Sequence, residues 1–256
     1  MCGIASFSFR MSDLRTIGIS LADFGSPNWW LAAAITLLFA AFGRLVRGVT
    51  TPGAVAGALV CLALISGAGW GGFASLCAVF ILTWIATRIG YHRKQSLGTA
   101  ERRAGRNAGQ VIANLGVAAA AALLHLSFPN PRLLVALGAA LAEATADTVS
   151  SEIGQAMGGI PRLVTNWRAV APGTDGAITF LGTAAGCVGA VLIAVTCAVA
   201  HVFAWDRVVL CAVAGAAGML VDSILGATVE RRGWLGNNGV NFLSTAAAAG
   251  LAFLLS

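Results

Sequence analysis

The chain has 256 residues and a net charge of +6, and 58% of its residues are hydrophobic while only 10% are charged. Soluble globular chains carry about 25% charged residues, so this composition excludes an ordinary soluble domain. It also argues against a nucleic-acid-binding protein, because the basic residues flank apolar segments and lack an aromatic-rich binding surface.

Residues 1–28 contain no small-residue cleavage pattern and are expected to form an N-terminal segment that is not a signal peptide. Residues 29–256 are predicted to form a single integral membrane domain, because apolar windows of about 18 residues follow one another through it. The predicted fold is all-α, a polytopic transmembrane helical bundle with about eight spans. The predicted spans cover residues 29–46, 52–67, 70–88, 109–127, 132–156, 176–203, 207–228 and 239–255.

The distribution of Lys and Arg over the connecting segments predicts the orientation of these spans. Twelve of the 16 basic residues fall on one side and the other four on the opposite side. Cytoplasmic loops carry an excess of Lys and Arg, so we expect the loop 88–109 in the cytoplasm and both termini outside it. The expected location is the inner (plasma) membrane of the cell, with any nucleotide site facing the cytoplasm.

Three carboxylates, Glu143, Asp147 and Glu152, lie in the cytoplasmic half of the predicted span 132–156. Glu143 and Asp147 are four residues apart and therefore share one helix face. A charge within the bilayer costs about 2.5–3.5 kcal/mol, so we expect a cation between them. Oxygen ligands without nearby His or Cys favour a hard ion such as Mg²⁺. Interhelical ion pairs with arginines remain an open alternative for all three.

The stretch "PGTDGAITFLGT", residues 172–183, leads into the sixth predicted span. Its glycines free the backbone for a turn, and a helix is expected to start near Asp175 with its N–H groups facing the cytoplasm. Such a helix start binds phosphate groups. The candidate phosphate-binding residues here are Gly173, Thr174, Asp175 and Gly176.

Asp222 lies in the cytoplasmic half of the seventh predicted span, at the depth of the fifth span's carboxylates. Asn114 begins the fourth span, and Asn237, Asn238 and Asn241 begin the eighth. An unpaired amide within an apolar span is costly, so Asn241 in particular is expected to serve a site.

Arg102, Arg103 and Arg106 lie in the predicted cytoplasmic loop, directly before the fourth span. Two interpretations remain open. The arginines either mark the cytoplasmic side of the membrane or clamp phosphate groups with their planar guanidinium groups.

Four ordered motifs resemble the signature blocks of domain-of-unknown-function family 92, a membrane family that includes the plant phytyl-phosphate kinases. They are "GRNAGQVIANLG", "ATADTVSSEIGQ", "PRLVTNWRAVAPGTDGAITFLGT" and "DSILGATVERRGWLGNNGVNFLST". The resemblance covers about residues 30–256. The second and third motifs are more distantly similar to CTP-dependent polyprenol kinases and CDP-diacylglycerol synthases. Asn107 stands where many relatives are expected to have Asp, and Gly239 where an acidic residue often follows "NN".

The resemblance implies a CTP-dependent kinase that converts an isoprenoid (phytyl or prenyl) monophosphate into the diphosphate at the cytoplasmic membrane face. Its cofactor would be Mg²⁺. The expected catalytic residues are Asp147, Asp222 and Arg106, and the expected metal ligands are Glu143, Asp147, Glu152 and Asp222. The expected nucleotide- and phosphate-binding residues are Gly173, Thr174, Asp175, Gly176, Arg102, Arg103, Asn114, Asn237, Asn238 and Asn241.

Two other functions remain open from the sequence. Carboxylates within the membrane also occur in transporters and flippases for anionic lipids or ions, although no inverted internal repeat is visible. A cytidylyltransferase that forms a CDP-lipid would use the same nucleotide and metal. The sequence does not determine the prenyl chain length, the nucleotide base, or whether chains associate into a homo-oligomer.

Overall fold

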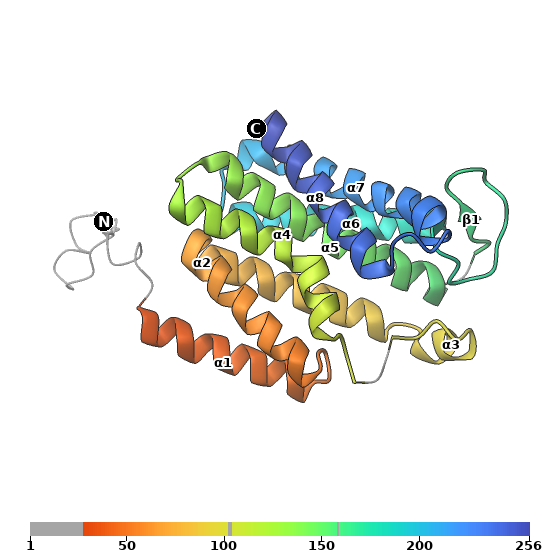
Figure 1. The fold of residues 1–256 in the computed structure, drawn as a ribbon, viewed down its shortest axis with the longest axis horizontal. Coiled ribbons are helices and arrows are strands. Elements are labelled where there is room, and N and C mark those ends of the chain that lie inside the picture. The colour runs from red at the N-terminus through yellow and green to blue at the C-terminus, as the bar shows by residue number, and fades with distance from the viewer. Residues whose placement is uncertain (1–27, 102–103, 158) are drawn as a thin grey trace, which may run out of the picture.

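The computed structural model describes residues 28–101, 104–157 and 159–256, and these form a helical bundle with one short strand pair (Figure 1). The predicted all-α membrane fold is confirmed. In chain order the elements are α1 (Trp29–Leu45), α2 (Thr51–Arg88), α3 (Tyr91–Ser96), α4 (Ala108–Ser127), α5 (Pro131–Met157), β1 (Arg162–Leu163), β2 (Ala177–Ile178), α6 (Phe180–Val199), the 3₁₀ turn η3 (Trp205–Arg207), α7 (Val208–Leu225), the π-helical turn η4 (Gly226–Glu230) and α8 (Asn237–Leu255).

α2 is interrupted at Gly69, whose φ of 61° and ψ of −156° lie outside the helical region. A residue with a side chain rarely adopts this conformation, so glycine allows the chain to reverse there. Figure 1 shows the two arms of α2 meeting near its label. These arms are the predicted spans 52–67 and 70–88. The two arms of α2, together with α1 and α4–α8, make eight helical segments. This number agrees with the prediction of about eight spans.

α5 lies at the centre of the bundle and contacts α2, α4, α6, α7 and α8. In its most apolar window 72% of the residues are buried, compared with 33–39% in the other long apolar helices. Small side chains such as Ala136, Ala139 and Ala140 let the neighbouring helices approach closely. By contrast, large apolar side chains such as Trp30 and Phe180 project outward, as expected for a surface that faces lipid.

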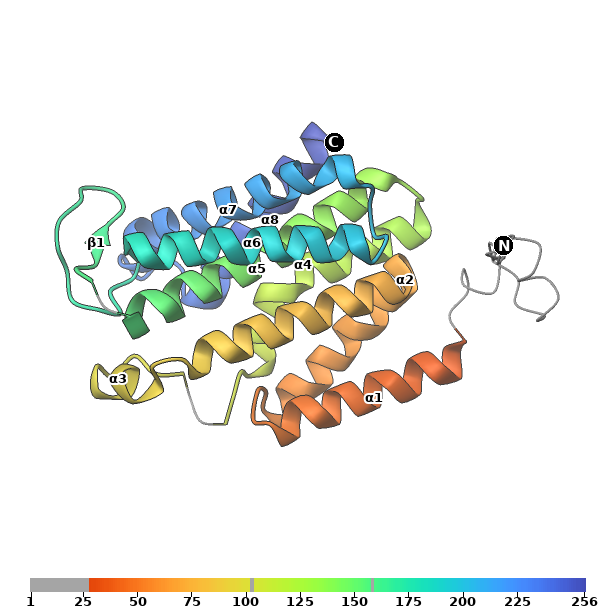
Figure 2. The same ribbon diagram turned by 180° about the vertical axis from the view of Figure 1, so that it is seen from behind.

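The connections divide between two ends of the bundle. Figures 1 and 2 show α3 and the β1–β2 strand pair at one end, which we call the α3 end. The start of α1, the reversal of α2 and the C-terminal end of α8 lie at the opposite end. The helix α3, within the loop 88–109, and the C-terminus therefore lie at opposite ends of the bundle. That the α3 end faces the cytoplasm stays a prediction.

The prediction that a helix starts near Asp175 is wrong, because α6 begins only at Phe180. Gly173 and Gly176 have φ values of 82° and 71°, which a right-handed helix does not accommodate. The next two residues, Ala177 and Ile178, pair instead with Leu163 and Arg162 of β1. Thr179 then caps the helix by accepting a hydrogen bond from the N–H of Gly182.

Candidate functional site

A polar cavity of about 290 Å³ opens at the α3 end of the bundle, between α4, α5, η4, the start of α8 and the segment 159–179. Its lining comes from all four sequence motifs, which are far apart along the chain. The predicted site residues that line it are Arg106, Asn114, Asp147, Glu152, Gly173, Thr174, Asp175, Gly176, Asp222, Asn237 and Asn241. Arg102 and Arg103 lie outside the described residues.

The acidic face of α5 places Asp147 in the cavity wall and Glu143 one turn deeper. Glu143 is 1% exposed, and its Oε1 atom has no hydrogen-bond partner among the described residues. α7 passes directly over it at Gly218, where a Cβ atom would lie 2.5 Å from Glu143 Cγ. Within the described chain, neither Glu143 nor Asp147 forms an ion pair. The open alternative of interhelical arginine pairs is therefore not observed for these two carboxylates.

Asp222 lies near the end of α7, and its Oδ2 atom accepts a hydrogen bond from Ser244 Oγ of α8 at 3.2 Å. Beyond it the helix widens into the π turn η4, a distortion that often marks functional sites. The turn carries Glu230 to the cavity wall. The loop around Gly176 packs so closely on η4 that a Cβ atom there would lie 2.2 Å from the Ala227 backbone nitrogen.

Asn114 and Asn241 join α4 to α8 through a buried hydrogen bond from Nδ2 of Asn241 to Oδ1 of Asn114, 3.3 Å long. This contact removes the cost of an unpaired amide within the bundle. Asn237 lines the cavity as the first residue of α8. Asn238 packs instead over Gly109 at the start of α4, so its side chain is not part of the cavity wall.

Arg106 reaches from the segment before α4 to α5, where its Nη2 atom donates a hydrogen bond to Thr148 Oγ1 at 3.1 Å. The guanidinium group therefore lies next to the residue that follows Asp147. The neighbouring Asn107 begins α4 as part of a capping box with Gln110. An asparagine can fill that capping position as well as an aspartate.

Glu152 forms an ion pair with Lys94, a residue that the sequence did not mark as part of the site. Lys94 is fully buried and also donates hydrogen bonds to the carbonyl oxygens of Ala86 and Thr87 at the end of α2. The pair connects α2, α3 and α5. Of the two interpretations open for Glu152, this geometry favours the ion pair over a metal ligand.

The cavity offers oxygen donors for a hard cation but no complete protein cage. Among the described residues, no group of three or more His, Cys, Asp or Glu side chains is arranged to hold a metal ion. Mg²⁺ usually keeps several waters and binds one or two carboxylates together with substrate phosphates. Asp147 and Asp222 on facing helices, with the unpaired Oε1 of Glu143 below them, fit this kind of binding.

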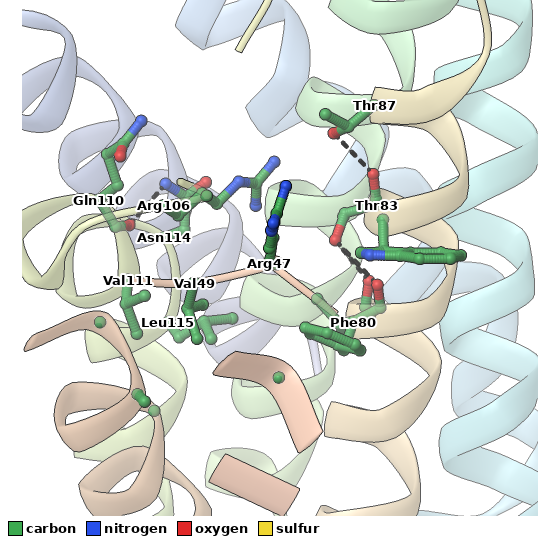
Figure 3. A pocket seen from close by; sticks show the side chains of 18 of the residues that line it. Arg47, Val49, Phe80, Thr83, Thr87, Arg106, Gln110, Val111, Asn114 and Leu115 are labelled. Atoms are coloured by element: carbon green, nitrogen blue, oxygen red, sulfur yellow. Dashed lines mark hydrogen bonds between the residues drawn. The ribbon is translucent and has the colours of Figure 1, made fainter. Parts of the chain in front are cut away.

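A second cavity of about 450 Å³ adjoins the polar one and is largely apolar. It lies between α1, the two arms of α2 and α4 (Figure 3). The two cavities share Glu101, Arg106, Gln110 and Asn114 in their linings. The sequence did not predict this cavity, because its walls are formed by ordinary apolar residues of helices that are separate in sequence.

Known proteins are similar to most of this chain. It is 39% identical to an uncharacterized membrane protein of Methanocaldococcus jannaschii, MJ0933, over 66% of this chain and 70% of that protein. It is 31% identical to an uncharacterized membrane protein of Synechocystis, sll0875, over 87% and 90% of the two chains. It is 30% identical to the chloroplastic protein VTE6 of Arabidopsis thaliana, over 99% of this chain and 79% of that protein.

No solved structure matches the chain significantly. Residues 34–249 match the family described as integral membrane protein DUF92, and this range includes the walls of both cavities. The family inferred from the four motifs is thus confirmed, and the chain belongs to the DUF92 family of integral membrane proteins.

Proposed function

We propose that this protein is a membrane kinase that transfers the γ-phosphoryl group of CTP to an isoprenoid monophosphate and so forms the diphosphate. The choice of an isoprenoid acceptor and of CTP follows the family resemblance of the four motifs. The match to the chloroplastic relative VTE6 along almost the whole chain supports a shared function of this kind.

The observation that carries the proposal is the junction of a polar and an apolar cavity at Arg106. A kinase acting on a lipid phosphate must bring a soluble polyphosphate and an insoluble chain to one point. The polar cavity has carboxylates on α5 and α7 and an arginine before α4. The apolar cavity provides an environment for hydrocarbon at the same place.

The reaction needs little acid–base chemistry from the protein. A phosphate monoester has a second pKa of about 6, so the acceptor is already ionised near neutral pH. One of its oxygens attacks the γ-phosphorus of CTP, the bond from that phosphorus to the bridging oxygen breaks, and CDP leaves. Holding the two phosphates in line and neutralising their charge are the main tasks of the site.

Residues of this chain can perform both tasks. Arg106 has five N–H donors in a planar group, of which one is used by Thr148, so others can bind phosphate oxygens. Asp147 and Asp222, with Glu143 beneath them, would hold Mg²⁺. The bound ion would supply positive charge for the nucleotide phosphates. The loop Gly173–Gly176 faces the same cavity and would contact the nucleotide.

Two labelled nucleotides separate the kinase from its alternatives. Purified protein in lipid nanodiscs is incubated with Mg²⁺, geranylgeranyl monophosphate and CTP labelled at the γ- or the α-phosphate. A kinase transfers the γ label to the lipid, whereas a cytidylyltransferase transfers the α label and releases diphosphate. Absence of both products, with substrate binding intact, would contradict an enzymatic function and favour a transporter.

A further inference from the structure

The apolar cavity has the dimensions and walls of a ligand site. Its volume of about 450 Å³ lies within the range of about 300–1,000 Å³ for pockets that enclose small ligands. Phe39 of α1, Leu76 and Phe80 of α2, and Val111 and Leu115 of α4 form its apolar walls. Figure 3 shows Phe80, Val111 and Leu115 among them. Of these helices, α1 carries exposed apolar side chains on the outside of the bundle.

One end of this cavity carries three arginines and one carboxylate. Arg47, Arg88 and Arg106 line it there, together with Glu101. Arg88 is engaged, since its Nη2 atom donates to Val46 O at 2.7 Å and its guanidinium carbon lies 4.1 Å from the centre of the Trp84 ring. The Arg47 side chain, by contrast, makes no hydrogen bond or ion pair with any described residue, and Figure 3 shows it extending into the cavity.

Backbone pairing holds Arg47 and Arg106 near one another. The N–H of Arg106 donates to Gly48 O at 3.0 Å, and the N–H of Thr50 donates to Arg106 O at 2.9 Å. The contact is so close that a Cβ atom at Gly105 would lie 2.4 Å from the carbonyl carbon of Gly48. Arg47 and Arg106 carry like charges, so an anion bound between them would reduce their repulsion. The φ of 56° at Arg47 lies in the left-handed region, as is common just past a helix end.

We infer that the apolar cavity binds the hydrocarbon chain of an isoprenoid monophosphate and that Arg47 and Arg106 bind its phosphate group. The ligand's identity rests on the proposed function, but its binding requires no phosphoryl transfer. A phosphate between Arg47 and Arg106 lies at the junction of the two cavities, where the lining is shared. The hydrocarbon chain of the ligand then extends along α2 and α4, away from Asp147 and Asp222.

A substitution at Gly57 can block the proposed site of the hydrocarbon chain without disturbing the fold. Gly57 lines the cavity one helical turn after Gly53, which packs against the carbonyl oxygen of Arg106. A Cβ atom at position 57 would meet no atom within 4 Å. A Gly57→Phe side chain should therefore occupy space meant for hydrocarbon. Gly250→Phe on α8 is the matched control, because a Cβ atom there also meets nothing and the position is exposed and outside the cavity lining.

Binding of radiolabelled geranylgeranyl monophosphate to purified protein is measured in nanodiscs without nucleotide. Gly57→Phe should weaken binding about tenfold, the effect of roughly two methylene groups that can no longer be buried, while Gly250→Phe binds like wild type. The preference for geranylgeranyl over dimethylallyl monophosphate should fall in Gly57→Phe alone. If a folded Gly57→Phe protein keeps the affinity and the chain-length preference of wild type, the apolar cavity does not bind the hydrocarbon chain.

The phosphate contact has its own test. Arg47→Gln should reduce the preference for geranylgeranyl monophosphate over the uncharged alcohol geranylgeraniol by about tenfold or more. Arg44→Gln is its control, because Arg44 lies at the same end of α1 but bonds to Thr51 and lies outside the cavity lining. An unchanged preference in Arg47→Gln would remove Arg47 from the site.

These measurements separate the inference from the proposed function. If the lipid binds with the expected mutational effects but no label is transferred from CTP, the binding site stands and the kinase function fails. If label is transferred and Gly57→Phe accepts long and short chains as wild type does, the kinase function stands and the binding site fails.

Discussion

Arg106 donates a hydrogen bond to the hydroxyl oxygen of Thr148 at 3.1 Å, and this hydroxyl in turn donates to the carbonyl oxygen of Ala144 at 2.9 Å. The two bonds tie the segment before α4 to the acidic helix α5. They orient one N–H of the guanidinium group and hold the arginine next to Asp147. A positioned arginine of this kind differs in its chemistry from a basic residue that only marks the cytoplasmic side of a membrane protein.

Arg106→Lys tests that difference, because lysine keeps the charge but loses the planar array of donors. We expect a loss on the order of 2–4 kcal/mol in kcat/KM for the labelled-CTP reaction, as for other preorganised electrostatic groups. The loss should appear mainly in kcat if the contact forms in the transition state. Arg44→Lys, a change at the same end of the bundle outside both cavities, should be silent. Normal kinetics of Arg106→Lys would return Arg106 to the role of a topology signal.

Asp147→Asn and Asp222→Asn should each reduce turnover by at least about a hundredfold, because a neutral amide binds Mg²⁺ more weakly than a negatively charged carboxylate. Both variants should insert and remain folded, since neither carboxylate has an ion-pair partner within the described chain. Turnover is measured beside size-exclusion profiles and thermal unfolding. Asp206→Asn serves as control, because Asp206 pairs with Arg207 at the opposite end of the bundle. Collapse of both proteins would instead indicate a structural role.

The sequence predicted at which end of the bundle the site residues lie better than it predicted which residues they contact. Charges within apolar spans are costly, so Asp147 and Asp222 could be assigned to one end of the bundle from the predicted spans and their orientation. The predicted span 132–156 also agrees closely with α5 (Pro131–Met157). Asp175 was misplaced because the glycines around it have positive φ values and pack against distant segments, Gly173 against Thr99 and Gly176 against η4, which no local pattern reveals.

Arg47 and Lys94 illustrate what sequence alone could not separate. Both were part of the charge pattern that predicts orientation, and a basic residue counts equally there whether it is solvated or buried. Lys94 becomes buried because α3 folds back onto α5, where Gly90, with a φ of 63°, packs against Ala156. Arg47 reaches a cavity only because its turn pairs with the backbone of Arg106.

Orientation in the membrane can be tested with single cysteines at the two ends of the bundle. In a background without native cysteines, Ser256→Cys should react with a membrane-impermeant maleimide in intact cells. Ser96→Cys, at the exposed end of α3, should react only after permeabilisation. The expectation follows from the excess of basic residues around the α3 end. The reverse labelling pattern would place the polar cavity on the side that lacks cytoplasmic nucleotides.

The Lys94–Glu152 pair allows the two roles open for Glu152 to be separated. Removing one partner of a buried ion pair leaves an uncompensated charge and costs about 3–5 kcal/mol. Glu152→Gln should therefore lower the thermal unfolding temperature, since Lys94 is fully buried.

Lys94→Met combined with Glu152→Gln should recover much of that stability, because no charge is then left unpaired in the interior. A metal ligand would behave differently. Glu152→Gln would then raise the Mg²⁺ concentration needed for half-maximal turnover, and Lys94→Met would not restore it. Thermal unfolding and Mg²⁺ titration of wild type, both single variants and the double variant complete the cycle. Recovered stability with an unchanged Mg²⁺ requirement identifies Glu152 as the partner that holds α3 against α5.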